Sequence, residues 1–119
     1  MRLPIQYALT YPSRVPGPAR RLDLLGCGPL HFAPPDLETF RCLALAIAAA
    51  KEGGTAPAIL NGANEVAVAG FLEGKLGFLD IPRVVEAALD QVAREPLSLE
   101  AVHRADHLAR EAAQAVLDA

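Results

Sequence analysis

Residues 58–72 are the most apolar stretch of the chain, and they carry one narrow polar stripe. Residues three and four apart stack on one helix face, so Asn61, Asn64 and Glu65 share a face with Val68 after them. The other positions are Ala, Val, Leu, Ile, Phe or Gly. A helix that is apolar nearly all round lies inside a bundle. The pattern therefore predicts a central helix whose stripe meets a polar group of another element, within this chain or outside it.

Helical spacing begins at residue 36 and predicts a helix before the central one. We expect it to run from Arg41 to Lys51, with Thr39 as its cap and Gly53-Gly54 at its end. The central helix then begins after Thr55 and stops near Gly74.

Two further helices follow, because apolar residues recur at helical spacing after two capping residues. Asp80 caps the first, whose predicted buried face is Ile81, Val84, Val85, Ala88, Leu89 and Val92. Ser98 caps the second, whose predicted buried face is Leu99, Val102, Ala105, Ala109, Ala113 and Val116. Four helices of about 12–19 residues with short links predict a mainly α fold, an antiparallel four-helix bundle.

The first 35 residues have a different pattern. A short apolar segment runs from Ile5 to Tyr11, and residues 13–35 hold most of the prolines and several glycines. Proline removes a backbone donor and restricts the residue before it, so no long helix fits there. We predict an extended Pro/Gly-rich arm, with residues 22–25 and 30–33 as short extended pieces.

Composition favours a soluble, cytoplasmic protein of one domain. The chain has 119 residues, 52% hydrophobic, with a mean hydropathy of +0.25. No window reaches the roughly 18 apolar residues of a membrane span, and residues 1–6 lack the apolar centre of a signal peptide. Cys27 and Cys42 are far apart, which predicts reduced, half-buried thiols rather than a disulfide.

Charge is divided unevenly along the chain. The net charge is −3, with four arginines against Asp23 alone in residues 1–35, and seven basic against thirteen acidic residues after them. No basic face is large enough to predict nucleic-acid binding. The simplest interpretation is a positive arm attached to an acidic body.

Two histidines offer a candidate metal site. His103 and His107 are four residues apart on the last predicted helix, a spacing that can place two imidazoles on one metal. The motif is not HExxH, because Arg104 follows the first histidine, and no Cys/His cluster supplies a third ligand. Histidines on a solvated helix face are the favoured interpretation, and a zinc site is the alternative. Gly26-Cys27-Gly28 lacks the third glycine of a phosphate-binding loop.

The polar stripe of the central helix has two interpretations. Glu65 can act as a metal or substrate carboxylate, or the stripe can bond to neighbouring elements within the fold. The second is favoured because buried polar groups without partners are strongly unfavourable. We therefore predict that Glu65→Ala lowers stability more than it changes the affinity for any ligand.

Several motifs carry a resemblance to a known family. They are Met1–Ile5, Tyr11–Arg14, Leu30–Asp36, Leu60–Glu65, Phe78–Ile81 and Asp106–Arg110. In this order they closely resemble the 1-deoxy-D-xylulose 5-phosphate reductoisomerase family, across essentially the whole chain but only in the family's C-terminal third. Two departures are modest: Arg41 stands where the family commonly has Pro, and Gly62 replaces Ala at a cost of about 1 kcal/mol in a buried helix.

The resemblance implies a domain organisation. Residues 1–22 correspond to the tail of the catalytic or connective domain, residues 23–38 to a linker arm, and residues 39–119 to the C-terminal four-helix domain. The Rossmann-type NADPH domain of the α/β full-length family is absent here. Met1 matches an internal methionine near the mobile substrate-covering loop, so we expect this chain to have been cut or restarted there.

The resemblance also implies a function for the parent protein. Such enzymes use NADPH and a divalent cation, Mg or Mn, to convert 1-deoxy-D-xylulose 5-phosphate to 2-C-methyl-D-erythritol 4-phosphate in isoprenoid precursor biosynthesis. No catalytic, cofactor or metal residue carries over to this chain, so we expect it to be inactive alone. Its implied partner is the rest of the parent enzyme, a homodimer.

A free-standing helical protein-interaction module is the alternative function. If residues 1–12 belong to the sheet or core of another domain, Ile5, Leu9 and Tyr11 lack their partners in this chain. We therefore expect the start of the chain to be disordered or to self-associate.

Overall fold

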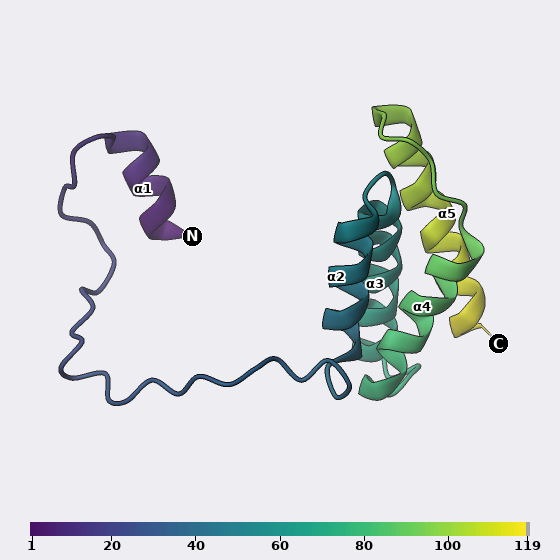
Figure 1. Cartoon of the computed structure of the whole chain (residues 1–119), viewed down its shortest axis with the longest axis horizontal. Helices are drawn as coiled ribbons and strands as arrows, with labels where there is room; N and C mark the ends of the chain where they lie inside the picture. The colour runs from purple at the N-terminus through teal and green to yellow at the C-terminus, as the bar shows by residue number, and fades with distance from the viewer. Residues whose placement is uncertain (119) are drawn as a thin grey trace. The chain divides into compact units, whose positions relative to one another are not determined.

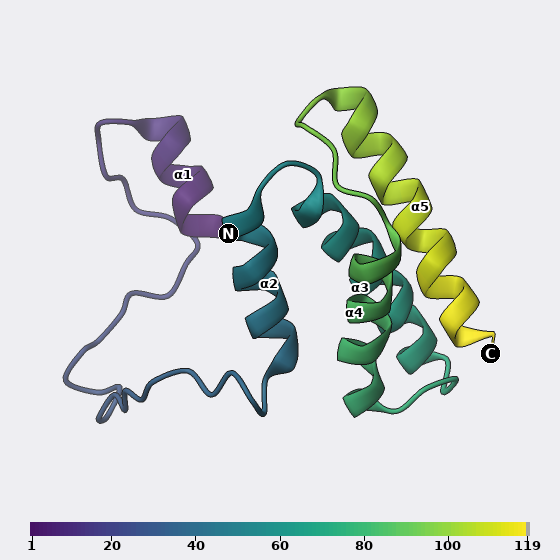
Figure 2. The ribbon, with the colours of Figure 1, turned by 45° about the vertical axis from the view of Figure 1, so that its right-hand side comes forward.

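A computed structural model describes residues 1–118 and divides the chain into two units, residues 1–34 and the part from residue 35 onward. The second unit contains four helices, α2 (Arg41–Glu52), α3 (Ala56–Leu72), α4 (Ile81–Gln91) and α5 (Leu99–Leu117), with a short 3-10 helix, η1 (Phe78–Asp80), before α4. Successive helices of this unit run in opposite directions (Figure 1), and a second view agrees (Figure 2). The predicted antiparallel bundle is confirmed, and no strand occurs within residues 1–118.

Helix α3 is the centre of the bundle. It packs against α2, α4 and α5, as expected for a helix that is apolar on most sides. Ile59, Ala63 and Ala67 are fully buried on it. The short side chains of alanine and glycine let neighbouring helices approach α3 closely; a Cβ added at Gly70 would lie 2.9 Å from a methyl group of Leu117.

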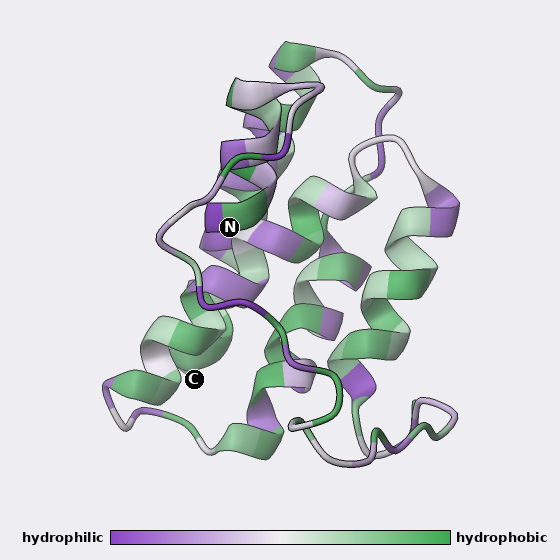
Figure 3. Ribbon diagram, turned by 90° about the vertical axis from the view of Figure 1, so that its left-hand side faces the viewer, coloured by the Kyte–Doolittle hydropathy of each residue, from purple (hydrophilic) through white to green (hydrophobic). Residues whose placement is uncertain are grey.

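The core combines branched side chains from α4 with alanines from α5. Every residue of the face predicted for α4, from Ile81 to Val92, is buried. Four alanines line the buried face of α5 (Ala101, Ala105, Ala109 and Ala113). The face predicted for α5 is correct from Ala105 onward but wrong at Leu99, which is exposed, because the buried residue of the first turn is Ala101. Hydrophobic residues predominate along α2 and α3 (Figure 3).

The hydrogen bonds at the helix starts confirm one predicted cap and contradict others. The hydroxyl of Ser98 accepts a hydrogen bond from the backbone N–H of Ala101 at 3.1 Å, which confirms the predicted cap of α5. Thr39 does not cap α2: the carboxylate of Asp36 accepts from the N–H groups of Glu38 and Thr39, and a turn through residues 37–40 precedes the helix. Asp80 directly precedes α4 as predicted, but its side chain does not cap the helix, because its carboxylate accepts from the N–H of Gly77 instead.

A hydrogen-bonded pair joins the start of α3 to the segment between α4 and α5. Buried Thr55 donates its backbone N–H to the carbonyl of Glu95 at 3.2 Å, and its hydroxyl accepts from the Glu95 N–H at 3.0 Å. Arg94 binds the carbonyls of Leu89 and Val92 at the end of α4 and pairs with a carboxylate of α2. These contacts hold the segment between α4 and α5 against the start of α3 and the end of α2.

The first unit buries almost nothing. Residues 2–10 form α1 (Arg2–Thr10), a helix that the sequence analysis did not assign, and none of its side chains is buried. The side-chain amide of Gln6 donates to the carbonyl of Val15 at 2.8 Å, and Arg14 lies over the ring of Tyr7. The rest of the arm has no regular secondary structure.

The remaining expectations for the arm are partly wrong. Residues 24–26 form a turn rather than an extended piece, and Cys27 beside it is exposed rather than half-buried. The boundary between the two units falls after residue 34, within the segment that the sequence analysis treats as a linker. No helix in the described part of the chain is long and apolar enough to cross a membrane.

Candidate functional site

The polar stripe of α3 meets its partner on α5. Asn61 and Glu65 are exposed rather than buried, because this edge of α3 lies at the surface beside α5. The Asn61 amide donates to one carboxylate oxygen of Glu65 at 3.0 Å, and the guanidinium of Arg110 donates to the other at 2.7 Å. Arg110 also binds the carboxylate of Asp106, one turn earlier on α5, at 2.8 Å. One arginine therefore joins two carboxylates on two helices.

Hydrogen bonds favour the charged forms of Glu65 and Arg110. The hydrogen bond from Arg110, followed by that from Asn61, lowers the pKa of Glu65 below its ordinary value. The hydrogen bonds to Asp106 and Glu65 raise the pKa of Arg110. Each carboxylate oxygen of Glu65 accepts one hydrogen bond within the protein, one from α3 and one from α5. These bonds fit a role in holding the two helices together.

Asn64 lies on a different side of α3 and belongs to a different feature. It is half-buried and lines a hollow of about 250 Å³ beside the start of α2 and the start of α4. We call this hollow the apolar groove; it is lined by Thr39, Phe40, Arg41, Cys42, Asn64, Val68, Phe78, Leu79, Ile81 and Pro82. The stripe therefore divides into a network facing α5 and a groove residue.

Gly62, the departure from the family motif within this stripe, lies at the contact between α3 and α5. A Cβ added there would lie 2.9 Å from a carboxylate oxygen and 3.0 Å from the carbonyl oxygen of Asp106. The sequence analysis treats Gly62 only as a loss of helix stability. The structure adds a compensating effect, because glycine allows α5 to approach α3 closely at this turn.

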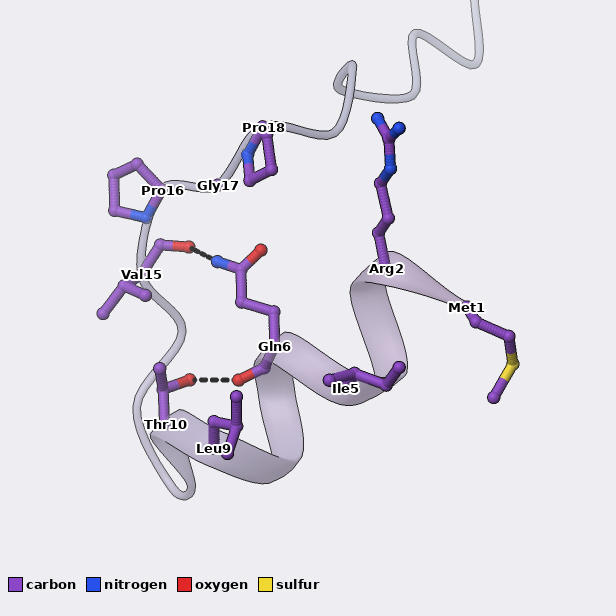
Figure 4. Close-up of a pocket in the computed structure, with 10 residues that line it drawn as sticks. All are labelled: Met1, Arg2, Ile5, Gln6, Leu9, Thr10, Val15, Pro16, Gly17 and Pro18. Atoms are coloured by element: carbon purple, nitrogen blue, oxygen red, sulfur yellow. Dashed lines mark hydrogen bonds between the residues drawn. The ribbon is translucent and has the colours of Figure 1, made fainter.

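Met1 lies at a hollow of the first unit. The hollow has a volume of about 550 Å³ and is lined by residues of α1 and by Val15–Pro18, with little polar surface (Figure 4). Met1 directly precedes the N-terminal end of α1 and is 90% exposed. The hydrogen bond between Gln6 and Val15 holds the wall opposite α1 in place.

The two histidines lie on the exposed side of α5, as the favoured interpretation expects. His107 approaches a carboxylate oxygen of Glu111 at 3.5 Å, and His103 is exposed. Within residues 1–118 no group of three or more His, Cys, Asp or Glu side chains is placed to hold a metal ion.

Comparison with known proteins identifies the family. The family described as "DXP reductoisomerase C-terminal domain" matches residues 1–112. The 1-deoxy-D-xylulose 5-phosphate reductoisomerase of Cupriavidus metallidurans is 52% identical over 118 residues, which are 98% of this chain and 30% of that protein. The Bacillus subtilis enzyme of the same name is 54% identical over 99 residues, or 81% of this chain and 26% of that protein.

Solved structures agree with this match. The Zymomonas mobilis 1-deoxy-D-xylulose 5-phosphate reductoisomerase in complex with NADPH has a TM-score of 0.87 and 44% identity, covering 99% of this chain and 32% of that chain. A DOX-P reductoisomerase in complex with magnesium has a TM-score of 0.86 and 38% identity, covering 98% and 32%.

The fold and these matches define the class of protein as a helical C-terminal domain. The chain belongs to the 1-deoxy-D-xylulose 5-phosphate reductoisomerase family. It spans about a third or less of the length of the relatives that it matches.

The described residues do not fit the groups bound in the related structures. A magnesium site requires several oxygen ligands close together, and residues 1–118 hold no group of three or more His, Cys, Asp or Glu side chains placed to bind a metal ion. A dinucleotide site requires a glycine-rich turn that opens a helix after a strand. Gly28 is followed by Pro29 in the arm, and no helix begins there.

Two features of the site were missed in the sequence. The partner of Glu65 is Arg110, 45 residues away, and only the pairing of Asp106 with Arg110 at i,i+4 points to it locally. The apolar groove is built from the beginnings of two helices and the side of a third, so no single segment reveals it.

Proposed function

We propose that this chain is the C-terminal structural part of an NADPH-dependent 1-deoxy-D-xylulose 5-phosphate reductoisomerase and is inactive by itself. In this proposal the parent enzyme forms 2-C-methyl-D-erythritol 4-phosphate in isoprenoid precursor biosynthesis. The parent requires NADPH and a divalent cation, Mg or Mn, and is a cytoplasmic homodimer. The carrying observation is the 52% identity over nearly the whole chain to only 30% of a curated reductoisomerase.

The domain assignment follows the same proposal. Residues 1–22 form the tail of the catalytic or connective domain, residues 23–38 the linker, and residues 39–119 the helical domain. Met1 then lies near the substrate-covering loop of the parent. The exposure of Met1 and of Ile5 and Leu9 on α1 supports this assignment, because a helix without a buried side chain needs an external surface for packing.

The polar network supports a structural role for the bundle. Arg110 connects Glu65 on α3 with Asp106 on α5, and Thr55 is bonded to Glu95 across 40 residues. These interactions fix the helices against one another without requiring a ligand. In the proposed enzyme the bundle is a rigid support for the part that carries the chemistry.

A chimera tests the proposal. The matched segment of the Cupriavidus metallidurans enzyme is replaced by this chain, and NADPH oxidation is followed with 1-deoxy-D-xylulose 5-phosphate and magnesium. We expect turnover by the chimera, and no turnover and no NADPH binding by this chain alone. A version of the enzyme that lacks the segment is the control and should be inactive.

Two results would overturn the proposal. One is turnover by the isolated chain, which would show that it carries its own chemistry. The other is a chimera that folds cooperatively and binds NADPH but has no turnover. The second result would favour the alternative of a free-standing interaction module.

A further inference from the structure

We propose that the apolar groove of the bundle is the surface on which the preceding, catalytic part of the parent reductoisomerase docks, with an apolar side chain inserted beside Asn64. This inference rests on the proposed function and adds to it a particular contact surface. The groove lies wholly within the second unit, between the start of α2, one side of α3 and η1 with the start of α4.

Several apolar side chains of the groove are strongly exposed. Phe40, Phe78 and Leu79 are 60%, 65% and 82% exposed, and Val68 continues the same surface on α3. Three of the four phenylalanines of the chain lie in or next to this hollow, because Phe71 stacks edge-on against Phe78 at 5.8 Å between ring centroids. Contiguous exposed apolar surface rich in aromatic residues is typical of the central part of a protein interface.

The charges around the groove leave it suitable for an apolar partner. Arg41, its one charged lining residue, is paired with Glu86 of α4. Burial raises the pKa of the Cys42 thiol, so this thiol remains neutral. Asn64 then supplies the polar group, whose amide can donate to and accept from the backbone of an inserted segment.

The length of the relatives and the net charge of the bundle indicate which polypeptide occupies the apolar groove. The curated relatives are about three times as long as this chain, so most of such a protein lies outside it. A segment of the same polypeptide reaches the groove at high effective concentration. A second copy of the bundle is disfavoured, because the chain after residue 35 carries thirteen acidic and seven basic residues and two copies would repel.

The test compares Leu79→Asp with Leu99→Asp in two settings. Both leucines are strongly exposed, both lie in the first turn of a helical segment, and both directly precede an acidic residue. Only Leu79 lines the groove. In the isolated chain neither substitution should change the Tm by more than about 2 °C, since surface changes have small effects. In the chimera described above, Leu79→Asp should lower kcat/KM or the Tm clearly, by at least about tenfold or 5 °C, and Leu99→Asp should not.

The possible outcomes separately test the docking surface, the proposed function and the identity of the occupant. Equal behaviour of the two variants in an active chimera would overturn the docking surface and leave the proposed function intact. A wild-type chimera that folds cooperatively and binds NADPH but has no turnover would overturn the proposed function. A dimer of the isolated chain that Leu79→Asp dissociates would replace the catalytic part by a second copy as the occupant. A thiol probe at Cys42 gives an independent measurement, with slower labelling expected in the chimera than in the isolated chain.

Discussion

The bundle and the N-terminal unit differ in whether their apolar side chains are buried. In the bundle, Ile59, Val84 and Val85 are removed from water by neighbouring helices of the same chain. In α1, Ile5 and Leu9 are also aliphatic side chains, like those of the bundle core, but they are 53% and 83% exposed. Hydrophobic residues stabilise a fold only where other elements cover them. The comparison indicates that the bundle carries its own stability and that α1 gains little stability from burial within its own unit.

The largest change in the free energy of unfolding is expected from truncating a side chain in the bundle core. Ile59→Ala removes a fully buried side chain at the centre of α3 and should destabilise the isolated chain by about 2–5 kcal/mol. Leu9→Ala in α1 is the matched change and should leave the free energy of unfolding within about 0.5 kcal/mol. Urea denaturation followed by circular dichroism measures both. Equal losses would contradict the division of stability between the two units.

A smaller effect is expected at the contact between α3 and α5. Gly62→Val places a branched side chain against Asp106 and should destabilise by about 1–3 kcal/mol through overpacking. Ala69→Val, on the exposed side of the same helix, has only the propensity change of about 0.5 kcal/mol. Thermal unfolding of both variants checks the difference. A Gly62→Val protein as stable as wild type would mean that the helices do not approach closely there.

Proteolysis compares the two units directly. Arg20 and Arg21 lie in exposed arm without regular structure, whereas Arg104 and Arg110 lie within α5. Trypsin should cut the isolated chain at the arm sites at least about tenfold faster, because cleavage within a helix requires local opening. Mass spectrometry should detect a persistent product that begins at Leu22. Early cuts within α5 would show that the bundle is not independently stable.

The smallest expected effect is the pH dependence of the Glu65 network. Its lowered pKa means that Glu65 binds its proton less readily in the folded state, so its stabilisation is present above the unfolded value of 4.5 and is lost as the pH falls. Glu65→Gln should therefore lower the Tm by a few degrees near pH 7, and the difference from wild type should shrink as the pH falls below 4.5. Glu38→Gln, without an ion pair, is the control. A difference in Tm that does not change with pH would contradict this account.

The sequence predicts the bundle well because helical spacing and capping residues are signals within single segments of the chain. The spacing of Val84, Val85 and Ala88 places them on one face, and Ser98 caps α5 as its position before the helix indicates. The failure at Thr39 is also local: two capping candidates lie close together, and Asp36 binds the turn instead.

The site is less predictable because its contacts are long-range or structurally irregular. Arg110 and Glu65 meet only through the packing of α3 against α5, which single-segment periodicity does not determine. The exposure of Asn61 follows from the same packing, since α3 has one edge free of neighbours. The groove residues Phe40 and Phe78 lie at helix beginnings, where no periodic pattern distinguishes an exposed aromatic from a buried one.

Native-state hydrogen exchange of the isolated chain tests the central difference most directly. Amides of α3 and α4 should exchange only through global unfolding, while those of α1 should exchange at rates near those of an unfolded peptide. That result would show that only the bundle stabilises itself. Protection of the α1 amides equal to that of α3 in a monomeric sample would contradict the account.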